Sequence, residues 1–342
     1  MVLCLYYKID RNNRISFILL HVDDMNGLFP RDGVERERVK FILEKKYDAL
    51  KEQRGDEVMY IGMEVRWNAS GKKFEIGMIK YIEKVALRYG IEKGVTNPNS
   101  HRTEYIGEDN DPIDDTEYRS LIGAIRYMAM LVKPVALYMI SVLSTKQGKA
   151  KIGDYKDALR VLKYLFHTRH ERHIINACGR NNVLHIWCDA SYGNYEDGHS
   201  VESIVVKLGE CKGAVYVGSW KQKAIAGSVG NAEVMSLTTG VQYGRYFHDV
   251  FEEIDERFKM KVKYYEDNQS TYDMVVGDAT CNILQEKFMR IRIAKLHEYW
   301  KYNKDEAEFI KVPTEEMVAD VGTKQLYGAK FKHAEVLLNG NY

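Results

Sequence analysis

Residues 183–192, VLHIWCDASY, decide the fold of this chain, because an apolar run ends there in a carboxylate and a turn. The run up to Trp187 predicts a buried strand, and Asp189 stands where that strand ends, before small, turn-prone residues. Taken alone, an Asp in this position is more often a turn former than a functional residue. Its meaning depends on the acidic residues that follow it along the chain.

Composition indicates a globular protein that is long enough for two domains. The chain has 342 residues, with 45% hydrophobic and 29% charged residues, values typical of a soluble protein with a sizeable core. The net charge is only +1, so a nucleic-acid partner would have to be held by local basic patches or by metal ions.

The five cysteines are scattered without a paired short spacing. This argues against a zinc site or a disulfide framework and for a reducing compartment. No apolar run is long enough to span a membrane, and the N-terminus lacks the pattern of a signal peptide. We therefore expect an intracellular protein that is not secreted and has no membrane partner.

The C-terminal half predicts a mixed sheet with helices packed on it. The opening run and the β-type runs at 203–208 and 214–220 predict three antiparallel strands, and a long helix is expected over 232–254. A strand at 261–265, a helix after it, a helix over 286–302 and a last strand at 307–312 follow. A final helix that starts at Pro313 and contains Asp320 completes the pattern.

Acidic side chains stand at the ends of these elements or within the final helix: Asp189, Glu233, Asp267 and Asp320. Adjacent strands can place Asp189 beside Asp267, and the long helix can bring Glu233 to the same edge. Carboxylates gathered in this way repel one another and are costly to bury unless cations neutralise them. Two Mg²⁺ ions, or Mn²⁺ in their place, would resolve the conflict and would suit hydrolysis of a phosphodiester.

The N-terminal half begins with a predicted hairpin whose second strand runs directly into Asp23 and Asp24. On this segment alone, the acidic pair fits a tight turn. A surface helix is expected over 33–50, a second hairpin from the two strands VMYIGMEVRW and KKFEIGM, and a helix over 79–89. The polar segment 95–115 is expected to be a linker, and helices follow it to about residue 167.

Short motifs recur along the whole chain: LLHVDDM, MYIGMEV, YRSLIGAIRYMAM, WCDAS, SWKQK, AEVMSL, DNQS and VPTEEMVADVGTK. Together, and in this order, they resemble the polyprotein of copia-type long-terminal-repeat retrotransposons in its reverse transcriptase and ribonuclease H portion. Any one of these motifs is weak evidence, whereas so many in register are specific.

The resemblance implies an α/β (α+β) fold in two parts. A truncated reverse transcriptase with palm, thumb and connection is followed by a ribonuclease H-like domain, which has a five-stranded mixed sheet flanked by helices. The boundaries expected on this basis are 1–94 for the partial palm and thumb, 95–117 for the linker, 118–175 for the helical connection and 180–342 for the ribonuclease H-like domain.

The resemblance also assigns catalytic and metal-binding roles to the four acids Asp189, Glu233, Asp267 and Asp320, with two Mg²⁺ ions as cofactor. Asp23 and Asp24 match the paired aspartates of the polymerase. The family's first polymerase aspartate lies on an upstream strand that this sequence does not include. We therefore expect the polymerase part to be incomplete and inactive, with Asp23 and Asp24 as vestiges.

Candidate nucleic-acid-binding residues form two groups, one at the strand end in SWKQK and one on the helix expected over 286–302. Their members are Trp220, Lys221, Gln222, Lys223, Arg290, Arg292, Lys295 and His297. These side chains would hold the phosphates and sugars of an RNA/DNA hybrid. A charge run is as often only a solvated helix face, and His297 fits a polar surface position equally well.

Two functions from different classes follow. In the first, the chain is an RNA-cutting endonuclease that hydrolyses the RNA strand of an RNA/DNA hybrid by two-metal catalysis. In the second, it is a catalytically silent remnant of a mobile element that acts at most as a nucleic-acid-binding or interaction module. The expected partners are a hybrid and the remainder of the Pol polyprotein, in a cytoplasmic particle or the nucleus.

Overall fold

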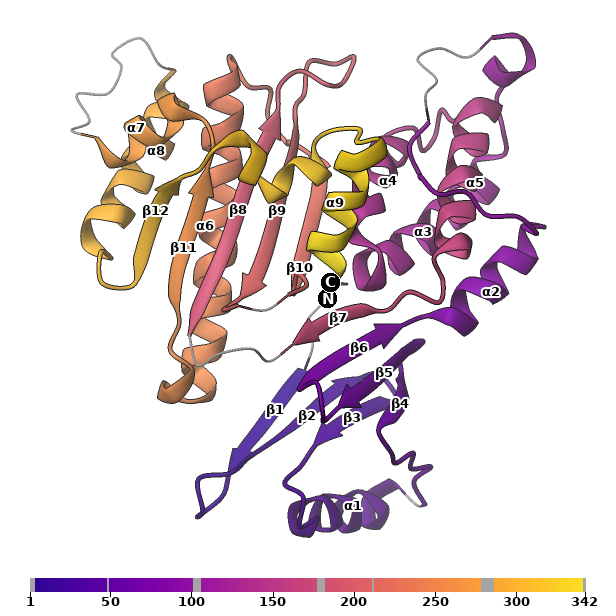
Figure 1. Cartoon of the computed structure of the whole chain (residues 1–342), viewed down its shortest axis with the longest axis vertical. Coiled ribbons are helices and arrows are strands. Elements are labelled where there is room, and N and C mark those ends of the chain that lie inside the picture. The colour runs from indigo at the N-terminus through magenta and orange to yellow at the C-terminus, as the bar shows by residue number, and fades with distance from the viewer. Residues whose placement is uncertain are drawn as a thin grey trace.

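The computed structural model describes residues 4–47, 49–100, 106–176, 182–210, 212–277 and 286–340, which form three sheets with helices packed on and between them (Figure 1). Within these ranges, no helix is both long enough and apolar enough to cross a membrane.

A five-stranded mixed sheet forms the centre of the C-terminal part, in the order β10–β9–β8–β11–β12. Its strands are β8 (Val183–Ser191), β9 (Val201–Leu208), β10 (Tyr216–Lys221), β11 (Lys261–Glu266) and β12 (Ala307–Lys311). Strands β8, β9 and β10 are antiparallel neighbours, whereas β11 lies parallel to both β8 and β12. The predicted meander, the two later strands and the mixed α/β fold class are therefore confirmed.

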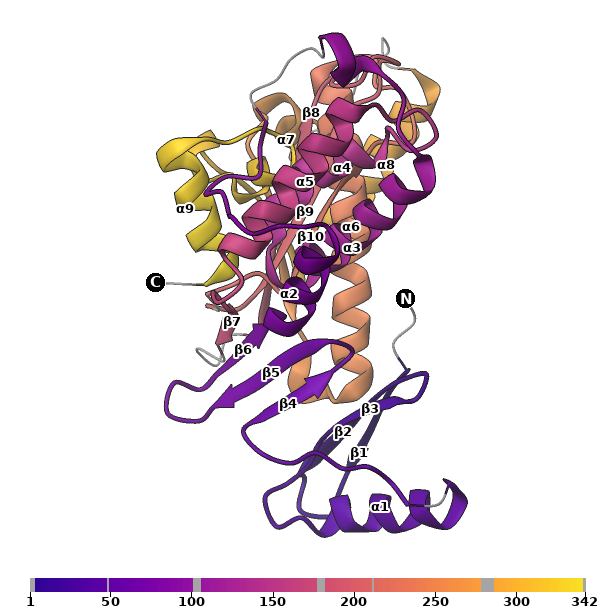
Figure 2. The same ribbon diagram turned by 90° about the vertical axis from the view of Figure 1, so that its right-hand side faces the viewer.

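Alternation along β8 and β11 sorts their side chains between the two faces of this sheet. Residues with even numbers, such as Ile186 and Tyr264, are fully buried against the long helix α6 (Val229–Ile254). Trp187 and Tyr265, which have odd numbers, are half-buried on the opposite face. Figures 1 and 2 show α6 on one side of the sheet and α9 (Gly328–Asn339) on the other.

Two glycines let α6 lie close to the sheet. A Cβ added at Gly240 would stand 2.1 Å from the Sγ of Cys188, and one at Gly244 would stand 2.2 Å from the hydroxyl of Tyr264. Neither distance leaves room for a carbon atom. Ser228 caps the helix by accepting a hydrogen bond from a backbone N–H of the first turn. The start of α6 is thereby held against the edge where β8 and β11 end.

The segment that carries Asp320 is not the predicted helix. After β12 the chain forms two short 3₁₀ turns, η4 (Thr314–Glu316) and η5 (Val318–Gly322), and α9 begins only at Gly328. Contact with the sheet sets this path, because the carbonyl of Gly322 accepts a 2.6 Å hydrogen bond from the hydroxyl of Ser219. The two remaining helices, α7 (Gln269–Val276) and α8 (Lys287–Tyr302), pack with α6 and confirm the predictions for those segments.

The N-terminal strands β1 (Cys4–Ile9), β2 (Ile15–His21) and β3 (Asp24–Leu28) form an antiparallel sheet in that order, and α1 (Val34–Tyr47) follows them. The first predicted hairpin is confirmed. Strand β3 was not predicted; it starts at Asp24, directly after the turn at Val22 and Asp23.

The next sheet corrects one prediction. VMYIGMEVRW was expected to be one strand, but it forms both β4 (Glu57–Tyr60) and β5 (Met63–Asn68). The turn between them is possible because Ile61 and Gly62 both take positive φ, at 43° and 82°. Strands β6 (Lys73–Gly77) and β7 (His173–Asn176) complete this sheet in the order β4–β5–β6–β7.

The helices predicted for the chain between β6 and β7 are confirmed. They are α2 (Ile79–Arg88), α3 (Asp115–Val132), α4 (Leu137–Ser144) and α5 (Ile152–His167). The expected linker is described apart from residues 101–105, and it is tied to the C-terminal part. The amides of Asn97 and Asn99 donate to the carbonyl of Leu326, and the hydroxyl of Tyr327 donates to that of Ser100. The domain boundaries stay predictions.

Candidate metal centre

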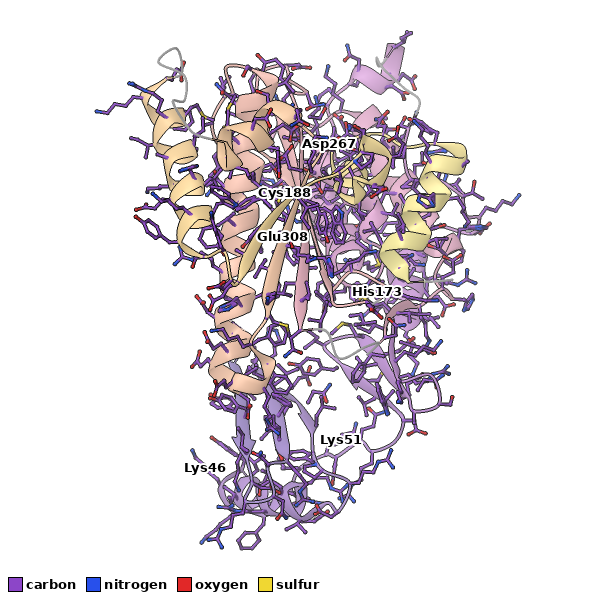
Figure 3. All side chains as sticks on the ribbon, turned by 60° about the vertical axis from the view of Figure 1, so that its left-hand side comes forward. Lys46, Lys51, His173, Cys188, Asp267 and Glu308 are labelled. Atoms are coloured by element: carbon purple, nitrogen blue, oxygen red, sulfur yellow. The ribbon has the colours of Figure 1, made fainter. Side chains whose placement is uncertain are left out.

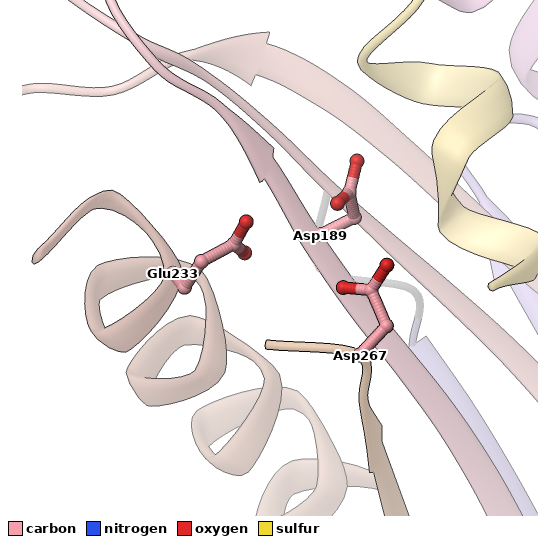
Figure 4. Close-up of side chains that lie close together, drawn as sticks. All are labelled: Asp189, Glu233 and Asp267. Atoms are coloured by element: carbon pink, nitrogen blue, oxygen red, sulfur yellow. The ribbon is translucent and has the colours of Figure 1, made fainter. Parts of the chain in front are cut away.

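Three carboxylates meet where β8 and β11 end and α6 begins. Asp189 belongs to β8, Asp267 directly follows β11, and Glu233 lies in the first turns of α6. Because β8 and β11 are parallel with Tyr265 opposite Trp187, the carboxylates two residues further along stand side by side. One oxygen from each of the three acids lies within 4.8 Å of the others, and Figure 4 shows the side chains converging.

Hydrogen bonds fix these side chains. Oε2 of Glu233 accepts a 2.9 Å bond from the N–H of Ala190. Oδ2 of Asp189 accepts a bond from the hydroxyl of Thr323. The backbone carbonyl of Asp189 accepts a 2.9 Å bond from the hydroxyl of Ser236. Strand β8, helix α6 and the end of η5 are therefore joined at the cluster itself.

Burial makes this cluster costly when no cation is present. Asp189 is 2% exposed and Glu233 is 4% exposed. Burial raises the pKa of Asp189 to about 7. Burial, followed by repulsion from Glu266, raises the pKa of Glu233 well above its usual range. A set of hard oxygen donors whose charges oppose one another fits divalent cations such as Mg²⁺.

Asp320, the fourth predicted acid, lies beside the cluster but is not one of the converging three. Its Oδ1 accepts a 2.5 Å bond from Nζ of Lys324. Burial opposes the charge of Lys324, but attraction from Asp189 and Asp320 outweighs it and raises the pKa of this lysine. The structure thus brings three predicted carboxylates together and pairs the fourth with a lysine at their margin.

No role was predicted for Glu266, the last residue of β11, although it adjoins Asp267. Its side chain is 1% exposed, and its Oε1 accepts a 2.9 Å bond from the N–H of Asn268. Its Oε2 has no hydrogen-bond partner among the described residues. Thr323 and Lys324 were also missed, although both belong to the motif VADVGTK.

Asp23 and Asp24, the acids predicted to match the polymerase motif, lie elsewhere. Asp23 is in the turn between β2 and β3, Asp24 is the first residue of β3, and both are exposed. Within the described ranges, the only group of three or more potential metal ligands is that of Asp189, Glu233 and Asp267. Asp23 and Asp24 are therefore not joined there by a third metal-ligating side chain.

Trp220, Gln222 and His297, which were predicted to bind nucleic acid, all have hydrogen-bond partners in the structure. Gln222 is 1% exposed, and its Nε2 donates to Glu202 and to a carbonyl of α6. Nε1 of Trp220 donates to the same Glu202. Nδ1 of His297 lies 2.9 Å from the carbonyl oxygen of Val275, so this bond joins α8 to α7. Contacts of these three side chains with a substrate stay predictions.

The cationic candidates are more accessible. Lys221 pairs with Asp197, and the guanidinium carbon of Arg292 lies 4.6 Å from the ring centroid of Phe288. The exposed members of the two groups are Lys223, Arg290 and Lys295.

Comparison with known proteins finds similar sequences in mobile elements. No family model matches it. It is 27% identical over 229 residues to a putative protein of transposon Ty5-1 from Saccharomyces cerevisiae, covering 66% of this chain and 71% of that protein. It is 22% identical over 345 residues to the retrovirus-related Pol polyprotein from transposon TNT 1-94 of Nicotiana tabacum, covering 98% of this chain but 25% of the polyprotein.

The solved structures that are similar to this chain include a cellular and a viral enzyme. A ribonuclease H1 isolated from compost is 16% identical, covering 41% of this chain and 91% of its own, with a TM-score of 0.32. A foamy viral protease-reverse transcriptase in complex with an RNA/DNA hybrid is 15% identical, covering 87% of this chain and 36% of its own, with a TM-score of 0.45. The resemblance predicted from the motifs is confirmed by the two sequence relatives: the chain is similar to the Pol polyproteins of retrotransposons.

Proposed function

We propose that this chain is a ribonuclease H-type endonuclease that hydrolyses the RNA strand of an RNA/DNA hybrid with two Mg²⁺ ions. The observation that carries the proposal is the convergence of Asp189, Glu233 and Asp267 within 4.8 Å at one edge of the sheet. The similarity to retrotransposon Pol polyproteins supports a nuclease of this class.

In this mechanism Asp189, Glu233 and Asp267 would hold the ions, and Asp320, which is paired with Lys324 in the structure, would supply a fourth carboxylate. Two such ions stabilise the attacking and leaving oxygens of a phosphodiester and lower the pKa of the attacking water. The chain's own groups orient the ligands, because the N–H of Ala190 binds Glu233 and the hydroxyl of Thr323 binds Asp189. Mn²⁺ meets the same ligand requirements as Mg²⁺ and is expected to replace it.

The proposal extends to the substrate and to the N-terminal part. The exposed cations Lys223, Arg290 and Lys295 contact phosphates of the hybrid, so cleavage weakens steeply as salt rises. Asp23 and Asp24 take no part, and the chain alone extends no primer. The remainder of the Pol polyprotein is the proposed protein partner, in a cytoplasmic particle or the nucleus.

Cleavage of an end-labelled hybrid by the purified chain tests this function. With Mg²⁺ present we expect Asp267→Asn to lower the cleavage rate by about 10³-fold, because one ligand of the cluster loses its charge. Asp273→Asn is the matched control, since this aspartate is exposed on α7, six residues along the chain. Equal background cleavage by the wild type and Asp267→Asn would favour the silent remnant instead.

A further inference from the structure

The face of the C-terminal sheet opposite α6 carries aromatic side chains that the proposed cleavage does not use. On β8, His185 and Trp187 precede Asp189 on the same face, because residues two apart on a strand share a face. On β11, Tyr265 precedes Asp267 in the same way, and the register sets the two rows side by side. The aromatic rows therefore lead directly to two of the three converging carboxylates.

The rings form one ordered array. The ring centroids of Trp187 and Tyr265 are 4.6 Å apart, and the ring planes differ by 12°. The ring of His185 lies 5.8 Å from each of them, and its Nδ1 is 2.7 Å from the hydroxyl of Tyr265. All three side chains are half-buried. Trp187 and Tyr265 also pack against the hydrophobic cluster that includes Met317 and Val321, so the array is held by the fold while part of it remains open to solvent.

Lysines flank the array. Lys207 on β9 is opposite His185, and its Nζ lies 5.7 Å from the ring centroid of Trp187. Lys263 on β11 is also opposite His185, and it pairs with Glu308 at 3.4 Å. Lys207 has no ion-pair partner among the described residues, and burial alone lowers its pKa, to about 8. Of these two lysines, Lys207 is therefore the one whose positive charge is available to a ligand.

Stacked rings beside an unmatched cation suit single-stranded nucleic acid. Bases stack on aromatic side chains whatever their sequence, and a lysine beside them meets the backbone phosphate. A duplex buries its bases and offers no such surface, so the ligand class is an unpaired strand.

We propose that His185, Trp187, Tyr265 and Lys207, called the aromatic platform here, bind the single-stranded continuation of the RNA strand next to the cleaved bond. The RNA strand is assigned because, under the proposed function, its phosphate is held at Asp189, two residues beyond Trp187 on the same strand. The choice of strand and its place next to the cleaved bond rest on the proposed function. Binding of single-stranded RNA to the platform requires no cleavage.

Fluorescence anisotropy with a labelled single-stranded RNA, measured on the full chain in EDTA, tests the platform. Lys207→Gln and Tyr265→Leu are each expected to raise the Kd by about 5- to 10-fold, through the loss of a phosphate contact and a stacking surface. The matched control is Lys304→Gln, because Lys304 lies 4.4 Å from the ring centroid of Trp300 at the end of α8, which packs on α6. This variant should bind like the wild type.

A second comparison identifies the strand. A hybrid with a single-stranded tail on its RNA strand should bind more tightly than a blunt hybrid, and Lys207→Gln should remove that advantage. The same tail on the DNA strand should give none. An equal gain from the DNA tail, or equal RNA binding by Lys207→Gln, Lys304→Gln and the wild type, overturns the proposal.

Failure of the proposed function and failure of the platform can be told apart. RNA binding that depends on Lys207 in a chain without cleavage activity refutes the proposed function and keeps the platform. Cleavage with RNA binding that is independent of Lys207 and Tyr265 refutes only the platform. Thermal melts of each variant show whether Tyr265→Leu still folds, and Lys207→Gln, which changes a half-buried side chain, carries the test if it does not.

Discussion

Gly322 determines how closely the segment that carries Asp320 approaches the sheet. A Cβ at this position would stand 2.2 Å from Oγ of Ser203 and 3.3 Å from Cβ of Ser219. Any side chain at Gly322 must therefore push η5 outward. The same movement would displace Thr323, whose hydroxyl binds Asp189.

We expect Gly322→Ala to lower the free energy of unfolding by about 1–3 kcal/mol, as overpacking of a tight contact does. Cleavage should fall as well, because the ligand segment shifts. Gly123→Ala is the control: its Cβ would meet nothing within 4 Å on α3, so this change should leave the protein as stable as before or slightly more so. Urea unfolding measures both, and a Gly322→Ala protein of wild-type stability would contradict the close contact.

Single residues also show what can be predicted from sequence. Asp189 and Asp267 could be placed side by side, because each ends an apolar run whose strand type is plain from its pattern. The burial of Glu266 could not be predicted from sequence, since it depends on the packing of α6 over the end of β11. The pairing of Asp320 with Lys324 was equally hidden, because it requires a 3₁₀ turn whose path is set by contacts with Ser219 and Ser203.

At the level of elements, the first turn of α6 sets the position of Glu233. Ser228 accepts a 3.2 Å hydrogen bond from the N–H of Asn231. Nε2 of Gln222 donates at 2.9 Å to the carbonyl of Ala232, so the end of β10 supports the same turn. The helix cap is therefore part of the support for the candidate metal centre.

Ser228→Ala should lower the free energy of unfolding by about 1 kcal/mol through loss of the cap. It should also weaken binding of Mn²⁺, because the turn that carries Glu233 frays. Ser228→Asn keeps an acceptor at the cap and should restore both properties. Urea unfolding and calorimetric titration with Mn²⁺ measure them, and unchanged values for Ser228→Ala would show that the cap is dispensable.

The junction between β7 and α9 contains a buried histidine. His173 is 5% exposed, and its Nε2 lies 2.7 Å from the carbonyl oxygen of Ala214. Burial lowers the pKa of His173 below its usual 6.5. Because the unfolded chain then binds more protons than the folded chain, stability is lost as the pH falls from 6.5 toward the lowered pKa.

His173→Gln keeps an N–H group for the carbonyl of Ala214 but does not titrate. We expect the wild type to lose more stability than this variant on acidification below pH 6.5, by about 1.4 kcal/mol for each unit by which the pKa is lowered. Urea unfolding across this pH range measures the difference between the two proteins. Parallel curves would mean that another group controls the acid response.

The periodicity of apolar residues predicted most helices and strands. It failed where tertiary contacts or rare backbone conformations determine the local structure. The turn at Ile61 and Gly62 interrupts an apolar run, and positive φ at an isoleucine leaves no signal in the pattern. Strand β7 was missed because its four residues gain order by pairing with the edge of β6, about a hundred residues earlier.

The whole molecule is unevenly packed. Helix α1 contains no buried residue, and in β1, β2 and β3 the only buried residue among those described is Ser16. This region joins the C-terminal part near the end of α6, where the hydroxyl of Tyr7 donates to the carbonyl of Glu253. Figure 3 shows Lys46 and Lys51 at the end of the molecule far from Asp267.

Local stability follows the density of buried contacts, so the N-terminal sheet should open more readily than the rest. We expect amides of β1, β2 and β3 to exchange with deuterium at least about 10²-fold faster than those of β8 and β11, whose inward side chains are fully buried. Helix α3, which buries a full apolar stripe, is the internal control. Because Asp23 lies in the turn between β2 and β3 and Asp24 begins β3, such opening would deprive the predicted polymerase motif of the fixed geometry that nucleotide addition needs. Equal protection of β2 and β8, measured by mass spectrometry, would instead show that the N-terminal sheet is as rigid as the metal centre.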